Sequence, residues 1–448
     1  MKILKFGGTS VGSPNAFLKV FDAIISNTDG KCVVVLSAVT GTTDKLLEAT
    51  NQSIKNLEQS FKILSEVKNK HLDIVNKLFE DNINLDNFVN SIFNDINNRI
   101  TAYNNLGELT SYNISSVVSY GEILSSRILF ELLQSKGVPS QLLDSRELIA
   151  TDNNYKESKV DYQLTYERFV SKSHIFETKN VFITQGFLGS CNKGKVSLLG
   201  RGGSDYSASL FGFFLNKMGH NIEEIQIWTD VSGVLSADPR IVTSSKTIKS
   251  MSYDEIRILS YLGAKVLHPD TIKPAISANI PLRVMNTFSH DNSLNTLILG
   301  SDKLVTPSIN SLILIDNCYE LKIFPDSTEN GFSTCERIYN LLRNSGNKIY
   351  LKIASEEVIK VYLKENPAPL LNITDNISFS INYISLLAFT GYNVSKMINI
   401  IYNSLDIFNL SIVAYTDNCC YLKCSEKFEI EKLNRLHNFV FDNYSQKE

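Results

Sequence analysis

The sequence predicts an α/β protein with a mainly parallel sheet covered on both faces, followed by two small α+β modules. Two observations lead to this fold class. Over the first 300 of 448 residues, short runs rich in β-branched residues alternate with helical stretches, and strands joined by helical crossovers form parallel sheets. From about residue 301, two runs repeat the layout β-α-β-β, which is typical of tandem modules. We therefore expect domains at 1–300, 301–368 and 369–448.

The first domain begins with two buried-looking strands, at residues 3–7 and 31–38. Helical stretches rich in Asn, Lys, Glu and Leu follow between residues 44 and 105. Apolar residues then recur at helical spacing over 121–137, where Gly137 serves as a C-cap. We expect the remaining strands of this domain at 140–144, 181–187, 195–200 and 222–230.

The repeated modules each open with an apolar strand, 312–324 in the first and 384–391 in the second. A helix follows each strand, at 331–346 and at 393–409, and the second helix carries apolar residues at i, i+3, i+4 and i+7. A last helix begins near Lys427. The paired strands that complete the modules are expected at 348–354, 358–363, 410–415 and 420–424.

Composition excludes several classes of function. The formal net charge is −3, so nucleic acid and anionic membranes are not expected partners. No apolar run approaches the ~18 residues that span a bilayer, and Gly7-Gly8 comes too early for a signal peptide. The cytoplasm is therefore the expected location. The seven cysteines are scattered, which indicates reduced thiols rather than a zinc site or a disulfide framework.

The stretch SLLGRGGSDYSASLFG, residues 197–212, joins an expected strand to an expected helix. We expect that helix to begin near Ser204 or Asp205, which are both good N-caps, and its free N–H groups would attract an anion. Arg201 adds a planar cation suited to a carboxylate or phosphate. The stretch predicts a site for an anionic small molecule. A tight capped turn with an exposed arginine would account for the same residues.

Polar residues also follow other expected strands, at the edge where open α/β sheets bind ligands. Gly-Gly after a strand can expose N–H groups to phosphate. Simpler interpretations remain open: Lys5 could be a solvated strand-end lysine, residues 238–240 could form a surface turn, and Trp228 could belong to the core. The candidates from these stretches are Lys5, Gly7, Gly8, Ser37, Thr43, Glu122, Thr229, Asp230, Arg240 and Lys265.

Residues 189–195, GSCNKGK, match a phosphate-binding P-loop up to its last position. Val196 stands where a Ser or Thr would hold Mg²⁺, and a strand rather than a helix is expected to follow. We expect a hairpin here instead.

Six motifs occur in order along the first 300 residues: KFGGTSV at 5–11, ITQGF at 183–187, LGRGGSDYSA at 199–208, WTDVSG at 228–233, ADPR at 237–240 and GAKVLHPDT at 263–271. Together they resemble the aspartate kinases of the amino-acid-kinase superfamily. The length and the C-terminal repeats resemble the single-function, lysine-sensitive-like type with two ACT modules. The resemblance implies a three-layer amino-acid-kinase sandwich over 1–300 and ACT-like modules at 301–368 and 369–448.

The activity that the resemblance implies is transfer of the γ-phosphoryl group of ATP, carried with Mg²⁺, to the β-carboxylate of L-aspartate. The product, 4-phospho-L-aspartate, leads toward lysine, threonine, methionine and diaminopimelate. The implied partners are aspartate, ATP and further copies of the chain, as a homodimer or higher oligomer assembled through the ACT modules, with no nucleic acid and no membrane.

The resemblance also implies roles for single residues. Lys5 would contact the phosphates, with N–H groups from Gly7 and Gly8, and Asp205 would orient the substrate ammonium or a nearby lysine. The aspartate would be held by Ser37, Thr43, Glu122 at its ammonium, Arg201 at its α-carboxylate, and Ser204. The nucleotide would be lined by Thr229, Asp230, Leu235, Arg240 and Lys265. No residue is implied as a metal ligand.

Two departures from the family pattern stand out. Leu235 replaces a tyrosine that relatives often carry, so a hydrogen bond in the nucleotide site would be missing. In lysine-sensing relatives a Met-Leu-His-Ser-Arg-Gly-Phe-like loop precedes the first ACT helix, whereas residues 326–332 keep only Gly-Phe and Tyr350 takes an acidic position. The altered loop and Tyr350 speak against inhibition by lysine. Two rival functions remain, a related carboxylate, carbamate or nucleotide kinase and a catalytically inactive amino-acid sensor.

Overall fold

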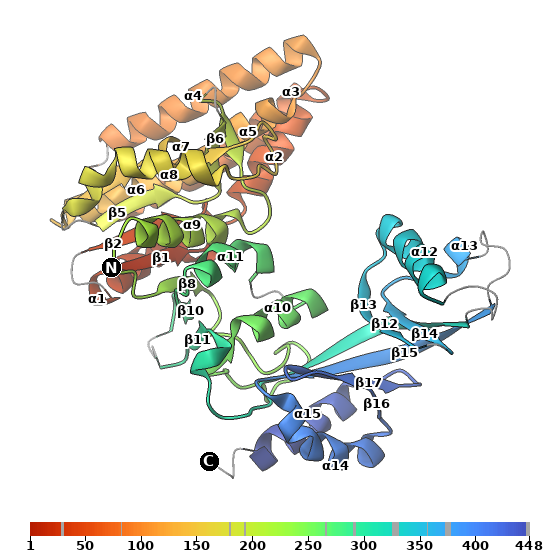
Figure 1. Cartoon of the computed structure of the whole chain (residues 1–448). Coiled ribbons are helices and arrows are strands. Elements are labelled where there is room, and N and C mark those ends of the chain that lie inside the picture. Colours follow the sequence, from red (N-terminus) through yellow and green to blue (C-terminus); the bar gives the residue numbers. More distant parts are fainter. Residues whose placement is uncertain are drawn as a thin grey trace. The chain divides into compact units, whose positions relative to one another are not determined.

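The fold is described from a computed structural model (Figure 1). It forms two compact units: an N-terminal unit of Met1–Val234 and Leu267–Gly300, and a C-terminal unit of Leu235–Val266 and Ser301–Glu448. The structure describes residues 1–27, 31–81, 83–178, 181–191, 194–264, 267–289, 293–324, 331–355, 357–371 and 378–444.

The N-terminal unit is built on a mainly parallel sheet, as the sequence predicts. Among the registers described for this sheet, only the pairing of β10 with β11 is antiparallel. Every residue of β2 and β5 is buried, because helices cover both faces of the strands. The strand order is β3 (Ser140–Leu143), β5 (Val181–Gln185), β2 (Cys32–Leu36), β1 (Lys2–Phe6), β8 (Ile225–Thr229), β10 (Leu282–Asn286) and β11 (Thr296–Leu299).

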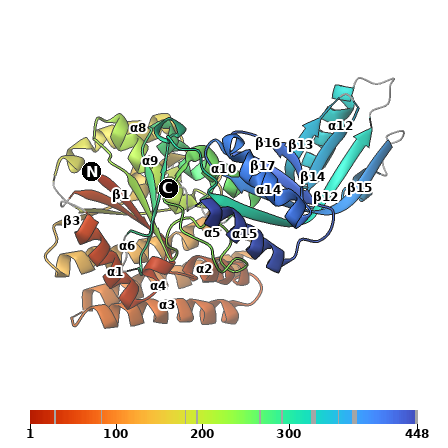
Figure 2. The same ribbon diagram turned by 90° about the horizontal axis from the view of Figure 1, so that it is seen from below.

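One face of this sheet packs against a layer of helices that includes the long α3 and α4, seen together in Figure 2. Leu4 and Phe6 of β1 point into this layer, where they meet the buried faces of the helices. The helical stretches expected between 44 and 105 are the helices α2, α3 and α4. The layer consists of α1 (Pro14–Asn27), α2 (Thr42–Gln52), α3 (Leu57–Leu78), α4 (Ile83–Leu106), α5 (Ser111–Val118) and α6 (Tyr120–Ser135).

The opposite face carries α8 (Tyr162–Ser171) and α9 (Gly203–Lys217), which lie on the other side of the sheet in Figure 2. A cluster of phenylalanines fills this layer: Phe169 of α8 stacks on Phe214 of α9 with ring centroids 5.2 Å apart, and Phe176 lies 5.3 Å from Phe182 of β5. The predicted three-layer sandwich is therefore confirmed.

The remaining elements of the N-terminal unit are short. Strands β6 and β7 pair antiparallel, so a strand follows residues 189–195 and the P-loop match is a hairpin, as expected. Residues 192 and 193 at its tip lie outside the described residues. The elements are β4 (Ala150–Thr151), β6 (Leu188–Cys191), β7 (Val196–Leu198), α7 (Ser145–Leu148), α11 (Pro269–Ser277), and the 3₁₀ turns Thr9–Val11 and Ser173–Glu177.

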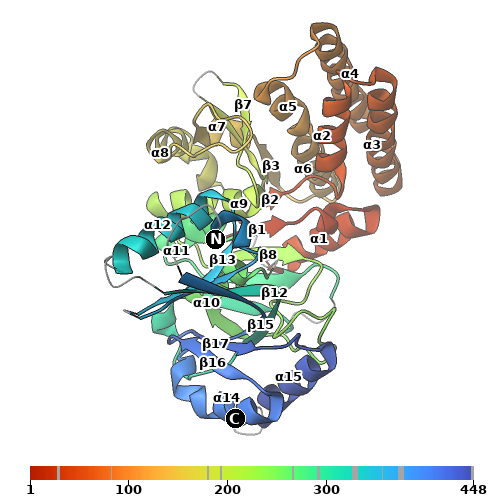
Figure 3. The same ribbon diagram turned by 90° about the vertical axis from the view of Figure 1, so that its right-hand side faces the viewer.

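The C-terminal unit contains one antiparallel sheet shared by both predicted repeats, visible with its helices in Figure 3. The two repeats join through β12 and β15, which pair along Ser311–Phe324. Its strand order is β13 (Ile349–Ala354), β14 (Ile359–Leu363), β12 (Ser311–Phe324), β15 (Ser378–Thr390), β17 (Cys419–Cys424) and β16 (Ser411–Tyr415).

Helices of the C-terminal unit lie against this sheet at two places. Ile338 and Leu342 of α12 pack on the β12–β14 strands, and Ile401 of α14 and Leu436 of α15 pack on β15 and β17. The further elements of this unit, with the bounds of these helices, are β9 (Ser250–Ser252), α10 (Tyr253–Leu262), α12 (Gly331–Asn344), α13 (Ala368–Leu371), α14 (Ile398–Phe408), α15 (Ile430–Tyr444), and the 3₁₀ turns Ser301–Lys303 and Val394–Met397.

Residues 235–266 group with the C-terminal unit although they precede residue 300. The domain limits expected at 300/301 and 368/369 stay predictions. Among the described residues, no helix combines the length and the apolar character needed to cross a membrane.

Candidate active site

A cavity of about 460 Å³ opens at the carboxyl ends of β1, β2 and β8 in the N-terminal unit. This is the sheet edge at which the sequence analysis expected a ligand. Its wall brings together segments that are far apart in the sequence. Among its lining residues are the predicted Lys5, Gly7, Gly8, Ser37, Thr43, Glu122, Ser204, Asp205 and Thr229.

Helix α9 begins slightly earlier than expected, and its polar side chains lie at the cavity. The helix starts at Gly203, and Gly202 is its N-cap at φ 69°. The expectation that Ser204 or Asp205 caps the helix is wrong, because a left-handed glycine already closes the turn. A Cβ at Gly202 would also lie 2.8 Å from Thr271. Ser204 and Asp205 are thus free to line the cavity.

Two helix N-termini open onto the same cavity. In α9, Tyr206 N–H donates to Gly202 (3.0 Å), and the N–H groups of Ser204 and Asp205 in the first turn have no intrahelical acceptor. Helix α2 begins after Gly41, at φ 76°, and its residue Thr43 also lies in the wall. Each helix end carries roughly +0.5 of an elementary charge. The cavity is therefore prepared for two anionic groups.

Lys5 lies at the centre of this arrangement. Its Nζ is 2.8 Å from Oδ1 of Asp205, and the two side chains are only 12% and 16% exposed. Side chains alternate along a strand, so Lys5 faces α9 while Leu4 and Phe6 face the opposite layer. The ion pair fixes an ammonium group in the cavity wall beside the first turn of α9. The simpler interpretation of Lys5 as a solvated strand-end lysine is wrong.

The two glycines after β1 differ in what they offer. Gly7 N–H donates to the carbonyl of Trp228 (3.1 Å), so the expectation that Gly7 gives its N–H to a phosphate is wrong. Gly8 N–H donates to no acceptor in the described part of the chain. A Cβ at Gly8 would lie 2.9 Å from the carbonyl oxygen of Ala38, so only glycine allows the two loops to approach this closely.

Glu122 is a buried acid in the cavity wall, with 3% of its surface exposed. Its Oε1 accepts a hydrogen bond from Ala38 N–H (3.3 Å), whereas Oε2 is buried with no partner among the described residues. Burial raises the pKa of this carboxyl group to about 8. A buried carboxylate with a free oxygen is suited to bind a cation, and an ammonium group would restore its ionised form.

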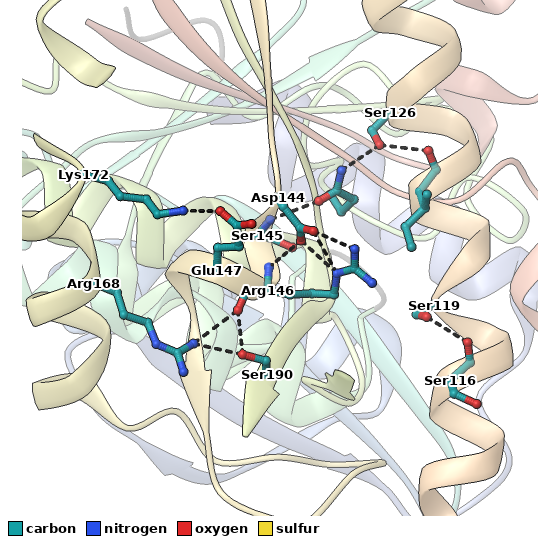
Figure 4. Close-up of polar contacts among 12 residues, drawn as sticks. Ser116, Ser119, Ser126, Asp144, Ser145, Arg146, Glu147, Arg168, Lys172 and Ser190 are labelled. Atoms are coloured by element: carbon teal, nitrogen blue, oxygen red, sulfur yellow. Dashed lines mark hydrogen bonds and ion pairs between the residues drawn. The ribbon is translucent and has the colours of Figure 1, made fainter. Parts of the chain in front are cut away.

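The helix that carries Glu122 is fixed by a buried polar chain, part of which is drawn in Figure 4. Ser126 Oγ on α6 accepts from the amide of Gln185 (3.0 Å), and the same amide's oxygen accepts from Ser145 N–H (3.0 Å). Ser125 Oγ donates to the carbonyl of Ser37 (2.8 Å). These contacts hold the start of α6 against β5 and the loop after β2.

Two further predicted residues, Arg201 and Asp230, are not in the cavity wall. Arg201 is exposed between the lining residues Gly200 and Gly202, and it forms no ion pair with any residue that the structure describes. Thr229 donates its hydroxyl to Asp230 (3.1 Å), and Asp230 is exposed outside the wall.

Three residues predicted to bind the nucleotide are not among the described residues of the N-terminal unit. Leu235 and Arg240 belong to the C-terminal unit, and Lys265 lies outside the described residues. Arg240 forms an ion pair with Asp238 (2.6 Å), and its side chain is 78% exposed. Residues 238–240 therefore form the surface turn that the sequence analysis gave as the simpler interpretation. Trp228 is buried and stacks on Phe6 with centroids 5.6 Å apart, so it belongs to the core.

Sequence reasoning missed Phe187, Asp44 and Lys70. Phe187 lines the cavity at φ 68°, a conformation that no residue pattern signals. Asp44 lies in the first turn of α2, and Lys70 reaches the loop before α2 from α3. In the part of the chain that the structure describes, no three His, Cys, Asp or Glu residues gather as a metal site would require.

Comparisons with known proteins agree with this geometry. The profile described as the amino acid kinase family matches residues 1–286. The bifunctional aspartokinase/homoserine dehydrogenase of Buchnera aphidicola is 29% identical, over 99% of this chain but only 57% of that protein. The lysine-sensitive aspartokinase 3 of Escherichia coli is 27% identical over 98% of this chain and 99% of that protein.

A solved structure is similar over the same length. The crystal structure of E. coli aspartokinase III in complex with aspartate and ADP has a TM-score of 0.77 and 25% identity, and the match covers 98% of this chain and 100% of that one. The family profile matches well over half of the residues. The chain belongs to the amino acid kinase family.

Proposed function

We propose that this chain is an aspartate kinase, which transfers the γ-phosphoryl group of ATP to the β-carboxylate of L-aspartate to give 4-phospho-L-aspartate. One observation carries the proposal: two helix N-termini and Lys5 surround a cavity that also contains a carboxylate oxygen of Glu122 with no partner among the described residues. An amino acid with a second carboxylate supplies both the ammonium and the anions that such a cavity would bind. The relatives named aspartokinase, one of them solved with aspartate and ADP, support the same reaction.

In this proposal the aspartate ammonium binds Glu122, whose buried Oε2 has no partner in the part of the chain that the structure describes. Ser204 and the N–H groups in the first turn of α9 donate hydrogen bonds to the α-carboxylate, and the exposed Arg201 closes on it. Ser37 and Thr43 lie beside the β-carboxylate or the transferring phosphoryl group. The β-carboxylate has a reference pKa of about 3.9 and is ionised at neutral pH, so the reaction requires no general base.

The work of the protein is then electrostatic. Two anionic groups about 4 Å apart repel by about 4 kcal/mol at an effective dielectric of 20, and the transfer proceeds when positioned charges offset this repulsion. Lys5, Gly8 N–H and the start of α2 provide positive groups, and Asp205 holds the Lys5 ammonium in place. Mg²⁺ enters with ATP as part of the substrate.

The nucleotide is proposed to lie toward Thr229 and Asp230 at the end of β8. Leu235, Arg240 and Lys265 are proposed as further nucleotide contacts on the strength of their motifs alone.

A coupled assay of ADP release across aspartate, glutamate, N-acetylglutamate and UMP tests the proposal against other kinases of the superfamily. We expect turnover with aspartate and none of comparable rate with N-acetylglutamate, because acetylation removes the ammonium group that Glu122 binds. Turnover with another acceptor and none with aspartate would contradict the proposal. Absence of turnover with every acceptor would favour the inactive amino-acid sensor.

The product would feed synthesis of lysine, threonine, methionine and diaminopimelate, and the C-terminal unit would join copies of the chain into a homodimer or larger oligomer. Light scattering of the purified chain tests the assembly. Residues 325–330, which include most of the loop that departs from the lysine-sensing pattern, lie outside the described residues. Titration of the activity with lysine tests whether inhibition is lost.

A further inference from the structure

The loop between β2 and α2, residues 37–41, forms one wall of the cavity. Several of its carbonyl groups accept hydrogen bonds from the protein. Ser125 Oγ donates to the carbonyl of Ser37 (2.8 Å), and Thr42 N–H donates to that of Val39 (2.9 Å). A carbonyl oxygen facing the cavity would repel an anion, so these bonds favour a wall that presents N–H groups.

The carbonyl of Thr40 is held by a charged donor from a different layer. Lys70 Nζ on α3 donates to it at 2.7 Å. On its other side, Thr40 N–H donates to the carbonyl of Gly8 (3.1 Å). Both backbone groups of Thr40 are therefore held by hydrogen bonds: its N–H by Gly8, in the loop after β1, and its C=O by Lys70 of α3.

The orientation of one peptide group follows from the Lys70 contact. In a trans peptide the C=O and the following N–H point in opposite directions, so the bond to Lys70 turns Gly41 N–H away from Lys70. Gly41 lies in the cavity wall, and its N–H has no acceptor in the described part of the chain. A Cβ built on Gly41 meets nothing within 4 Å, which shows that open space adjoins it.

Without a restraint, this peptide could turn over. Gly41 adopts φ 76°, and glycine occupies positive and negative φ about equally well. A flipped peptide would present the Thr40 oxygen instead of the Gly41 N–H, and would replace an attractive group by a repulsive one.

Lys70 itself projects from a firmly packed helix. Val67 and His71, which flank it on α3, are buried, and Ser60 Oγ of α3 donates to the carbonyl of Ala49 of α2 (2.7 Å). Burial lowers the pKa of Lys70. Lys45, on α2 nearby, pairs instead with Glu66 (2.7 Å) on the outer surface. Figure 3 shows α2 and α3 side by side.

We propose that Lys70 is a positioning residue, which holds the Thr40–Gly41 peptide so that Gly41 N–H faces the transferring phosphoryl group. This inference rests on the proposed aspartate kinase activity. Lys70 acts through the loop and does not touch the substrate.

The test compares Lys70→Met with Lys70→Arg and with the control Lys45→Met, using the full chain. Lys45→Met removes a neighbouring positive charge without removing a bond to the loop. We expect Lys70→Met to lower kcat by about tenfold to a hundredfold, the range for losing a hydrogen bond from a charged donor. Lys70→Arg should restore most of the rate, and Lys45→Met should stay within about twofold of the wild type, as an exposed ion pair contributes little.

Calorimetric titration with ADP, done without turnover, reports the fraction of folded protein in each preparation. We expect Lys70→Met to bind ADP with unchanged stoichiometry. The proposal is overturned if Lys70→Met keeps the wild-type rate, if Lys45→Met loses as much as Lys70→Met, or if Lys70→Met loses ADP stoichiometry. A wild-type chain that releases no ADP with aspartate would overturn the proposed function itself, whereas the other outcomes leave it standing.

Discussion

Replacing Glu122 with glutamine should make the free protein more stable while it removes aspartate binding. The folded protein buries this carboxyl group, with one oxygen unpartnered among the residues that the structure describes, and burial raises its pKa from 4.5 to about 8. Between these pH values the unfolded chain is ionised and the folded chain is not, so the unfolded chain binds fewer protons. The free energy of unfolding therefore falls as the pH rises through this window.

The size of the effect follows from the same two pKa values. At 1.36 kcal/mol per pH unit, the gap corresponds to an upper value of roughly 5 kcal/mol. Glu122→Gln, which carries no charge at any pH, escapes this penalty. We expect the stability difference between the variant and the wild type to grow by about 4 kcal/mol between pH 5 and pH 8.5.

Urea unfolding followed by tryptophan fluorescence measures this difference. The chain has one tryptophan, Trp228, buried in β8 of the N-terminal unit, so its signal reports the unit that contains Glu122. Added aspartate should stabilise the wild type and leave Glu122→Gln unchanged, since a ligand stabilises only the protein it binds. A stability difference that does not change with pH, or equal stabilisation of both proteins by aspartate, would refute the reasoning.

Three further variants test other parts of the account. Lys5→Met should lower kcat by about a hundredfold or more, as expected when a charge that stabilises the transition state is lost, and steady-state kinetics that show an unchanged kcat would remove Lys5 from the phosphates. Arg201→Ala should raise KM for aspartate about tenfold or more through loss of a charged hydrogen bond, with little change for ATP, and equal effects on both substrates would contradict its role. Burial lowers the pKa of His71 to about 4, so the free energy of unfolding of the wild type should fall as the pH falls from 6.5 toward 4. Urea unfolding of His71→Leu should show a smaller fall over the same range. An equal pH dependence of stability in the two proteins would contradict this prediction.

The sequence could place much of the cavity because parallel strands end at one edge of a sheet. Lys5, Ser37 and Thr229 each follow or end a strand that could be read from its β-branched residues, and the structure brings them to one cavity. Glu122 could be placed because it begins a helix with a clear apolar period. In each of these cases a local pattern and the topology of the sheet were sufficient.

Contacts that depend on tertiary structure could not be read in this way. Gly7 was expected to offer its N–H to a ligand, but the neighbouring strand β8 takes it through Trp228. The start of α9 was misplaced because Ser and Asp favour the N-cap, whereas Gly202 closes that turn in a left-handed conformation. Lys70 of α3 reaches Thr40, in the loop before α2, across 30 residues of sequence, and no local pattern marks it.

In the C-terminal unit, too, local patterns could be predicted and long-range contacts could not. Its repeated β-α-β-β layout was visible in the sequence, since each module has its own strand and helix periodicity. The pairing of β12 with β15 into one sheet joins residues 54 to 79 positions apart, and strand partners at that distance are chosen by packing rather than by local propensity.

A crystal structure of the chain with aspartate and ADP tests the central claim most directly. We expect the aspartate ammonium to lie within hydrogen-bonding distance of Glu122, its α-carboxylate at the first turn of α9, and its β-carboxylate beside Lys5 and the first turn of α2. An aspartate bound outside this cavity, or one whose ammonium group faces away from Glu122, would contradict it.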